Sequence, residues 1–296
     1  MFSRKKPKKA DSAEENPFVL SFSDLMAGLL AIFILALIVT MLELQKRQEE
    51  LRIKKDDLVQ SLTEIEAIQT NINSAMSGIA QHENALKFML QRIQTRLRDR
   101  KDQKVEVQVV QNGTVLRIQE TGLTFAKNSH VIEDKFQAKA LAIGEELLAE
   151  LESDANRRIL DTVFIEGHTD SLKKSDEMGN WGLSAYRAIS LWKFWTEKPG
   201  GPLRLKDLQN IPLNSDQSPQ PLISVSGYAD TRSTRPPSPN VVRPEDRPED
   251  RRIDIRFTLA ATEKRKLEEL QNNLKNVQSK MRTLISELSD LDKNAP

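Results

Sequence analysis

The chain of 296 residues contains no cysteine. This absence excludes disulfide bonds, thiolate metal ligands and thiol catalysis. Histidine is also scarce, because His82, His130 and His168 are the three in the sequence, and they show no metal-ligand spacing. No nucleophile–base pair stands out in the sequence either. We therefore expect neither enzyme activity nor a cofactor.

Aromatic residues are few, and neither sign of charge dominates. Phe, Trp and Tyr make up 5% of the chain, and 44 Lys and Arg residues stand against 43 Asp and Glu residues. So few aromatic side chains suit long exposed helices better than a large globular core. A net charge of +1 gives no basic field over the whole chain, so we expect no direct binding to nucleic acid.

The longest apolar run extends from Phe18 to Leu42 and encloses a single carboxylate, Asp24. A bilayer core of about 30 Å needs roughly 20 helical residues, so this run is long enough to span it once. A secretory signal has a shorter apolar core and a small-residue cleavage site, so we interpret residues 17–43 as an uncleaved transmembrane helix. The basic tail, residues 1–16, predicts a cytoplasmic N-terminus and translocation of everything after residue 44.

Asp24 is the candidate ion-carrying residue. An ionised carboxylate at membrane depth costs several kcal/mol unless it is paired or hydrated, and desolvation raises its pKa so that it can exchange a proton. Ser21 and Ser23 could help to coordinate a cation, so a proton is favoured over sodium only weakly. The alternative is that Asp24, near the start of the helix, lies in the wet membrane interface and carries no ion.

Two further segments show seven-residue repeats that are typical of coiled coils. In residues 44–100, which we interpret as a coiled-coil linker, one apolar series is unbroken, while Leu62, Met76, Leu90 and Leu97 fill a second series that polar residues interrupt. In residues 263–292 both series are filled. We expect this C-terminal helix either to fold back on the linker helix or to pair with its counterpart in a second chain. The unbroken linker series is Leu44, Leu51, Leu58, Ile65, Ile72, Ile79, Leu86 and Ile93.

Residues 104–260 alternate strand and helix patterns and predict an α/β domain, an α+β sandwich of the βαβαβ type. Asn112-Gly113 between two alternating runs is a strong signal for a β-hairpin. Helical periodicity covers residues 132–151 and 180–195, and apolar strand patterns cover residues 162–166, 222–226 and 252–259.

Several ordered blocks of this domain resemble the OmpA-like peptidoglycan-binding family. The matching blocks are Phe164 to Asp170 (FIEGHTD), then Asn180, Leu183-Ser184 and Arg187-Ala188, and finally Asp250-Arg251-Arg252-Ile253. Two departures stand out. Asp250 stands where the family usually has Asn, and the loops on both sides of residues 222–227 are longer than usual.

The resemblance implies a site for the diaminopimelate of the wall peptide. Asp170 would accept its ammonium group and Arg187 its carboxylate, while Asn180 and Leu183 would line the same groove. Alternatively, Asp170 and Arg187 form a structural ion pair. Arg252 is either a further binding residue or a support for the sheet edge.

The apolar run resembles the stator helix of the MotB type, and the matching residues are Phe22-Ser23-Asp24-Leu25-Met26. That resemblance implies a homodimer in the bacterial inner membrane, within a ring of five copies of a MotA-like or ZorA-like subunit, with the OmpA-like domain in the periplasm. The absence of a plug helix after the span and the C-terminal coiled coil make the chain most similar to the ZorB type of the Zorya anti-phage system. A flagellar MotB-type stator subunit and a passive tether between peptidoglycan and membrane are the alternatives.

Overall fold

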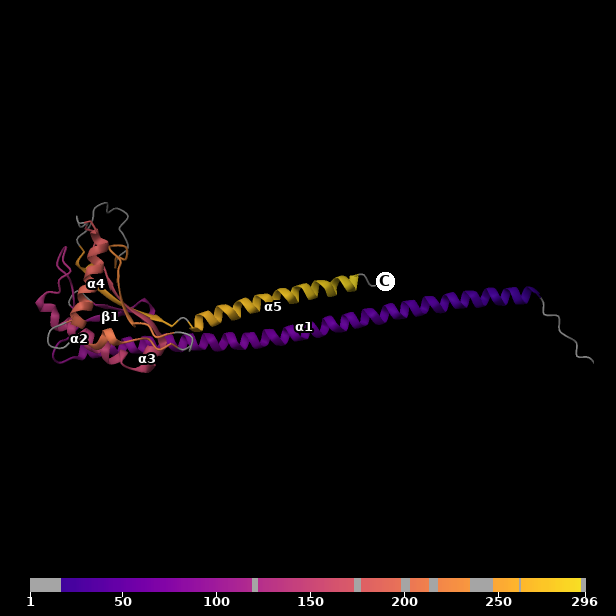
Figure 1. Cartoon of the computed structure of the whole chain (residues 1–296), viewed down its shortest axis with the longest axis horizontal. Coiled ribbons are helices and arrows are strands. Elements are labelled where there is room, and N and C mark those ends of the chain that lie inside the picture. Colours follow the sequence, from indigo (N-terminus) through magenta and orange to yellow (C-terminus); the bar gives the residue numbers. More distant parts are fainter. Residues whose placement is uncertain are drawn as a thin grey trace, which may run out of the picture. The chain divides into compact units, whose positions relative to one another are not determined.

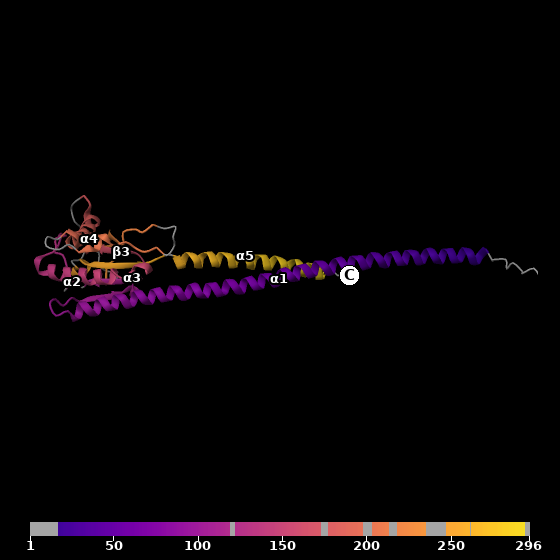
Figure 2. The same cartoon turned by 60° about the horizontal axis from the view of Figure 1, so that its bottom comes forward.

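The computed structural model describes residues 17–118, 122–172, 177–197, 203–212, 218–234, 247–260 and 262–293 (Figures 1 and 2). It divides into two units. The first contains the chain up to Ile68 together with Asn273 onward, and the second contains Gln69 to Asn272. The predicted basic tail, residues 1–16, lies outside the described residues.

Helix α1 (Pro17–Asp99) is a single helix of 83 residues. Pro17 occupies its first turn, where a missing N–H costs nothing. Its N-terminal part is long and apolar enough to cross a membrane. The side chains from Phe22 to Leu44 are exposed, as lipid-facing side chains of a lone span would be, and Asp24 is exposed among them. The prediction of one long apolar N-terminal helix is confirmed.

The second long helix, α5 (Thr262–Lys293), packs against α1 of the same chain in the first unit. Lys54 Nζ lies 2.9 Å from Glu287 Oε2. Ser61 on α1 and Val277 on α5 are only 1% and 9% exposed. The two views agree that α5 runs back alongside α1 (Figures 1 and 2). Folding back within one chain was the first of the two arrangements that the repeats allowed.

Over the middle part of α1 the buried residues differ from the second apolar series of the repeat. Leu62 and Met76 are 47% and 55% exposed, whereas Ser61 and Ala75, one position earlier in each case, are 1% and 2% exposed. Two neighbouring lines of residues on α1 could accompany the unbroken apolar series in a helix–helix contact. Sequence reasoning chose the line with Leu62 and Met76 because these residues are apolar. The small side chains of Ser61 and Ala75 instead permit close helix packing.

The end of the predicted linker belongs to the globular core and not to a coiled coil. Its side chains are completely buried together with residues of the sheet and of two other helices. A helix with one apolar face satisfies the same repeat whether it meets a helix or a sheet. The α1 residues concerned are Leu86, Met89, Leu90, Ile93 and Leu97.

The second unit holds a five-stranded mixed sheet in the order β1-β2-β5-β3-β4. Strands β3 and β4 are parallel and the other neighbours are antiparallel. The strands are β1 (Val107–Val110), β2 (Val115–Ile118), β3 (Leu160–Gly167), β4 (Ile223–Gly227) and β5 (Ile253–Leu259). The predicted hairpin joins β1 to β2, where Asn112 and Gly113 both have positive φ, at 56° and 86°. Asn and Gly adopt this conformation more readily than other residues.

Three helices complete the unit: α2 (Asp134–Leu151), α3 (Asp154–Ile159) and α4 (Gly179–Glu197). Helix α3, with six residues, is too short to show a periodic pattern and was not predicted. The end of α1, α2 and α4 share one apolar core with the sheet. The expected α/β class is therefore confirmed.

Alternation along β5 gives the sheet one apolar face and one charged face. Ile253, Ile255 and Phe257 belong to the core. Asp254 and Arg256 point to the other face, opposite Glu166 and Phe164 of β3. Charged side chains on this second face therefore come from several neighbouring strands.

Two glycines let α4 approach the sheet. A Cβ on Gly167 would lie 1.9 Å from the carbonyl oxygen of Ser184, and one on Gly227 would lie 2.6 Å from the amide nitrogen of Ala185. Any larger residue would push α4 off the ends of β3 and β4. Close packing here fixes α4, which carries three of the predicted wall-binding residues.

We predict that Lys54→Cys combined with Glu287→Cys will cross-link within one chain when treated with a short bismaleimide, because these side chains meet on adjacent helices. The absence of native cysteine makes the product unambiguous. Denaturing gels of the full chain would show a monomer of altered mobility. Arg52→Cys with Glu287→Cys is the control and should link poorly, since Arg52 faces another side of α1. Covalent dimers as the sole product would contradict the intrachain arrangement.

Candidate functional site

The predicted site begins where β3 leaves the sheet, at Gly167-His168-Thr169-Asp170. Backbone hydrogen bonds fix this turn on both sides. The N–H of His168 donates to Arg252 O at 3.0 Å, and the N–H of Thr169 donates to Ala229 O at 2.9 Å. Asp170 is thus held at the edge where β3 and β4 both end.

The structure brings Asp170 and Asn180 together. Asp170 is 6% exposed. Asn180 Nδ2 donates to the backbone oxygen of Asp170 at 3.2 Å. The Asp170 carboxylate pairs with Arg251, whose Nη1 donates to Oδ2 at 2.8 Å. Sequence reasoning missed Arg251, although it lies in the same motif as Arg252, because two adjacent arginines give no sign of which one faces the site.

Arg187 is completely buried and holds the turn through main-chain oxygens. Its Nε donates to Ser129 O at 2.9 Å, its Nη1 to His168 O at 2.9 Å and its Nη2 to Ala126 O at 3.3 Å. Burial lowers the pKa of Arg187 to about 10, and the nearby Asp170 carboxylate acts in the opposite direction. The guanidinium therefore remains charged at neutral pH and ties the segment before α2 to the end of β3.

Leu183 lies on α4 one turn before Arg187 and is 3% exposed. Its neighbour Ser184 accepts a hydrogen bond from the Ala229 N–H at 2.9 Å and donates to Trp181 O at 2.9 Å. The motif thus joins α4 to the loop after β4. The wall-binding roles of Asp170, Asn180, Leu183 and Arg187 remain predictions.

Arg252 does not lie with Asp170. It is 4% exposed, and its Nε lies 3.2 Å from Asp254 Oδ2 and its Nη1 3.4 Å from Asp250 Oδ1. Arg117 of β2 also binds Asp254, at 3.0 and 2.9 Å. Burial alone would raise the pKa of Asp254, but the hydrogen bonds from Arg117 and the charge of Arg252 hold it below its ordinary value. These contacts favour the supporting role at the sheet edge that the sequence left open for Arg252.

Asp250 stands where the OmpA-like family usually has Asn, and its contacts give a structural reason for the carboxylate. Its carboxylate accepts hydrogen bonds from Ser233 Oγ at 2.7 Å, from the Thr234 N–H at 2.7 Å and from Thr234 Oγ1 at 2.9 Å. An ionised acceptor strengthens each of these bonds and also meets Arg252. Asp250 therefore anchors the end of the loop that follows β4.

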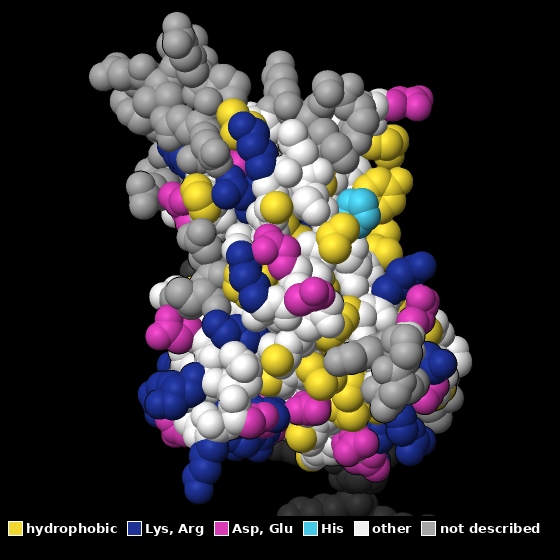
Figure 3. Space-filling view, turned by 90° about the vertical axis from the view of Figure 1, so that its left-hand side faces the viewer, with side chains coloured by type: hydrophobic (Ala, Val, Ile, Leu, Met, Phe, Trp, Pro, Cys, Tyr) yellow, Lys and Arg dark blue, Asp and Glu magenta, His cyan; other side chains and the backbone are white. Residues whose placement is uncertain are grey.

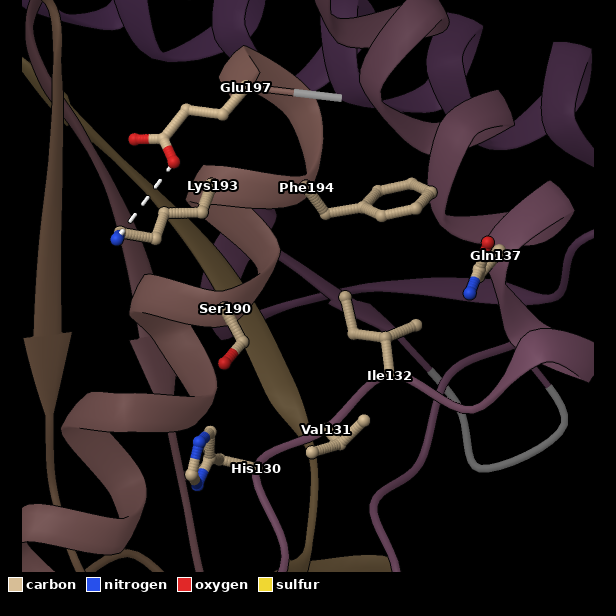
Figure 4. A pocket seen from close by; sticks show the side chains of 8 residues that line it. All are labelled: His130, Val131, Ile132, Gln137, Ser190, Lys193, Phe194 and Glu197. Carbon is tan, nitrogen blue, oxygen red and sulfur yellow. Dashed lines mark ion pairs between the residues drawn. The ribbon is translucent and has the colours of Figure 1, made fainter. Parts of the chain in front are cut away.

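A pocket of about 610 Å³ lies between α4 and the segment before α2. Ile132 and Phe194 face the same space, and the ion pair of Lys193 with Glu197 lies at its rim (Figure 4). Apolar side chains form a band down the face of the unit shown in Figure 3. Among the described residues no hydrogen bond joins Ser190 to His130 in this pocket, so they do not form a nucleophile–base pair.

A second pocket, of about 550 Å³, opens on the charged face of the sheet. We call it the arginine pocket. Arginines of four separate positions line it together with His168 and Tyr228, and its lining is otherwise polar. The lining residues are Gln111, Arg117, His168, Tyr228, Arg232, Ser233, Arg252, Asp254 and Arg256.

Asp24 belongs to the first unit, whereas the other predicted site residues belong to the second. Within the ranges that the structure describes, no group of three His, Cys, Asp or Glu residues could hold a metal ion.

Comparison with known proteins places the second unit in context. Residues 124–247 match the OmpA family. The uncharacterized protein YtxE of Bacillus subtilis is 26% identical over 263 residues, covering 86% of this chain and 93% of YtxE. The periplasmic domain of Helicobacter pylori MotB (residues 78–256) is 19% identical, with a TM-score of 0.36, and covers 54% of this chain and 84% of that chain. A MotB-like protein of Desulfovibrio vulgaris is 16% identical, with a TM-score of 0.35, and covers 66% of this chain and 99% of that chain. The family match and the mixed sheet confirm the predicted OmpA-like domain.

We predict that Arg187→Met will strongly destabilise the domain, because three main-chain oxygens lose a charged donor. A loss of about 3 kcal/mol is expected, which lowers the melting temperature by roughly 6–12 °C for a domain of this size. Thermal unfolding of the full chain in detergent measures the effect. Arg204→Met is the control, since that side chain is 80% exposed. An unchanged melting temperature for Arg187→Met would contradict its structural role.

Proposed function

We propose that the chain is a cell-wall-anchored stator subunit of an ion-driven motor in the bacterial inner membrane. One observation carries the proposal: a single chain joins an OmpA-like domain to an apolar helix with an embedded carboxylate. Helix α1 makes this connection without a break from Pro17 to Asp99. In this arrangement the N-terminus is cytoplasmic, α1 crosses the membrane once, and the domain lies in the periplasm.

At the wall, Asp170 binds the ammonium group of diaminopimelate in the peptide stem. Arg251 neutralises Asp170 in the present structure, so the incoming ammonium takes the place of the Arg251 guanidinium. Arg187 supports the turn with three of its five N–H groups and is completely buried, so a contact of the remaining two with the ligand carboxylate requires the groove to open on binding. Asn180 and Leu183 complete the groove from α4.

In the membrane, Asp24 takes up and releases a proton. Two chains place their α1 helices inside a ring of five MotA-like or ZorA-like subunits, which shields Asp24 from lipid. A proton that crosses 100 mV supplies about 2.3 kcal/mol, which is enough to bias one conformational step. Because the wall holds the domain, the surrounding ring turns relative to a fixed axis.

A role in anti-phage defence of the ZorB type is the first form of this proposal. It is supported by the long helix α5 and its packing on α1, which follow from the C-terminal repeats that first suggested this type. A flagellar stator subunit is the second form. A passive tether is the alternative from another class, and the exposed position of Asp24 close to the start of α1 is the observation that favours it.

For wall binding, we predict that Asp170→Asn will reduce cosedimentation of the full chain with purified sacculi that contain diaminopimelate by about tenfold, since loss of one charge-assisted contact is worth roughly 1.4 kcal/mol. Asp207→Asn, at an exposed position, should bind like the wild type. Equal binding of the wild type, Asp170→Asn and Asp207→Asn to sacculi would show that Asp170 does not contribute to wall binding. Melting temperatures of the two variants control for folding.

For ion transport, we predict that Asp24→Asn will abolish phage protection in cells that carry the whole locus, at matched protein level. Asparagine preserves shape but cannot carry a proton. Asp24→Glu is the matched variant and should retain part of the activity, because its carboxylate remains. Full protection by Asp24→Asn would favour the passive tether. A wild type that gives no protection but restores swimming to a stator-deficient strain would favour the flagellar form.

A further inference from the structure

The arginine pocket is separate from the proposed diaminopimelate site, although the two share the turn after β3. Asp170 pairs with Arg251, whereas Arg252, the next residue, faces Asp254 and Asp250. Adjacent residues along the chain point to opposite sides, so Arg251 serves one site and Arg252 the other. Arg117, Arg232 and Arg256 join Arg252 from β2, from the loop after β4 and from β5.

We infer that this pocket binds an oxyanion, a carboxylate or a phosphate group carried by a component of the cell envelope. Four guanidinium groups converge on one cavity of about 550 Å³. Guanidinium groups present paired N–H donors that match the geometry of carboxylate and phosphate oxygens. Binding of an anion goes beyond the proposed function, and only the assignment of its source to the cell envelope rests on the periplasmic placement proposed above.

Positive charge remains in excess after the internal ion pairs are counted. The four arginines face three carboxylates, those of Glu166, Asp250 and Asp254. These carboxylates are 0%, 2% and 1% exposed and therefore lie beneath the guanidinium groups. An approaching ligand meets arginine before it meets any acid.

Two of the arginines keep donors for a ligand. Arg117 binds Asp254 through Nε and Nη2, and no interaction is seen for its Nη1 within the described part of the chain. Arg232 stacks on the ring of Tyr228, with its central carbon 3.6 Å from the ring centroid, and its one ion pair, to Glu166, is long at 3.8 Å. Stacking orients the guanidinium and leaves its N–H edge open to the pocket.

A buried and unpartnered imidazole is the independent sign of a binding site. His168 lines the pocket, is 1% exposed, and neither ring nitrogen has a hydrogen-bond partner among the described residues. Its Nε2 lies 3.5 Å from Asp254 Oδ2, which is beyond a good hydrogen bond. Burial, together with the charges of Arg252, Arg117 and Arg232, lowers the pKa of His168 to about 3, while Asp254 acts in the opposite direction. The neutral ring carries one N–H group, which has no hydrogen-bond partner among the described residues and can donate to an anion in the pocket.

Calorimetric titration of the full chain in detergent tests this inference, with inorganic phosphate and acetate as separate probes. The wild type should bind one equivalent of at least one probe. Arg232→Gln and Arg117→Gln should each weaken binding about tenfold, equivalent to one charge-assisted contact. Arg204→Gln, with its exposed side chain outside the pocket, should bind like the wild type. Binding of phosphate alone would indicate a phosphate group as the ligand, and equal binding of acetate would indicate that a carboxylate is also accepted.

Two outcomes would overturn the inference. One is the absence of saturable binding of either probe to the wild type. The other is binding that Arg232→Gln leaves unchanged. This variant should keep its melting temperature, because no hydrogen bond of the Arg232 side chain is seen within the described part of the chain and its main-chain contact with Arg252 is retained. Asp170→Asn distinguishes anion binding from wall binding, since this variant should bind sacculi more weakly and bind the anion like the wild type. A failure to detect wall binding would therefore not contradict the anion site, and a failure to detect anion binding would not contradict the wall-binding site.

Discussion

One buried guanidinium determines the geometry of the OmpA-like domain around its motif. Arg187 reaches from α4 to main-chain oxygens at Ala126, Ser129 and His168, so α4, the segment before α2 and the end of β3 meet at one side chain. The desolvated charge is tolerated because every contact is a charge-assisted hydrogen bond. Asp170 occupies its position because the turn that precedes it is fixed in this way. Gly167 and Gly227 make the same arrangement possible from the sheet side by allowing α4 to approach.

The two faces of the sheet differ in character, because one forms the apolar core and the other carries charged side chains. The apolar face is covered by α2, α4 and the end of α1 and forms a single core. The opposite face of the sheet carries arginines and buried carboxylates. Without the arginines, the charges of these carboxylates would be left unpaired and would destabilise the sheet. A network of this kind holds β2, β5 and the loop after β4 in register. It also leaves guanidinium edges at the surface, and the same side chains that stabilise the sheet can therefore recognise a ligand.

Sequence reasoning succeeded where a local rule decides the structure. Asn112-Gly113 specified the β1–β2 hairpin because its positive φ angles are a property of those two residues. It failed where the choice depends on a distant partner. Nothing in the repeat of α1 shows whether Ser61 or Leu62 faces α5, and nothing in Arg251-Arg252 shows which arginine meets Asp170. The short helix α3 and the hydrogen bonds of Asp250 to Ser233 and Thr234 likewise arise from tertiary contacts that have no sequence signature.

The fold-back of α5 on α1 has a mechanical consequence. Helix α1 runs without a break from the apolar span into the domain, whereas α5 lies beside it, with Glu287 paired to Lys54. A pull along α1 is therefore borne by its own backbone hydrogen bonds. Bending is different, because a second helix held at a distance from the first increases the flexural rigidity of the pair. Helix α5 therefore makes the part of α1 that it packs against harder to bend, without making α1 harder to stretch.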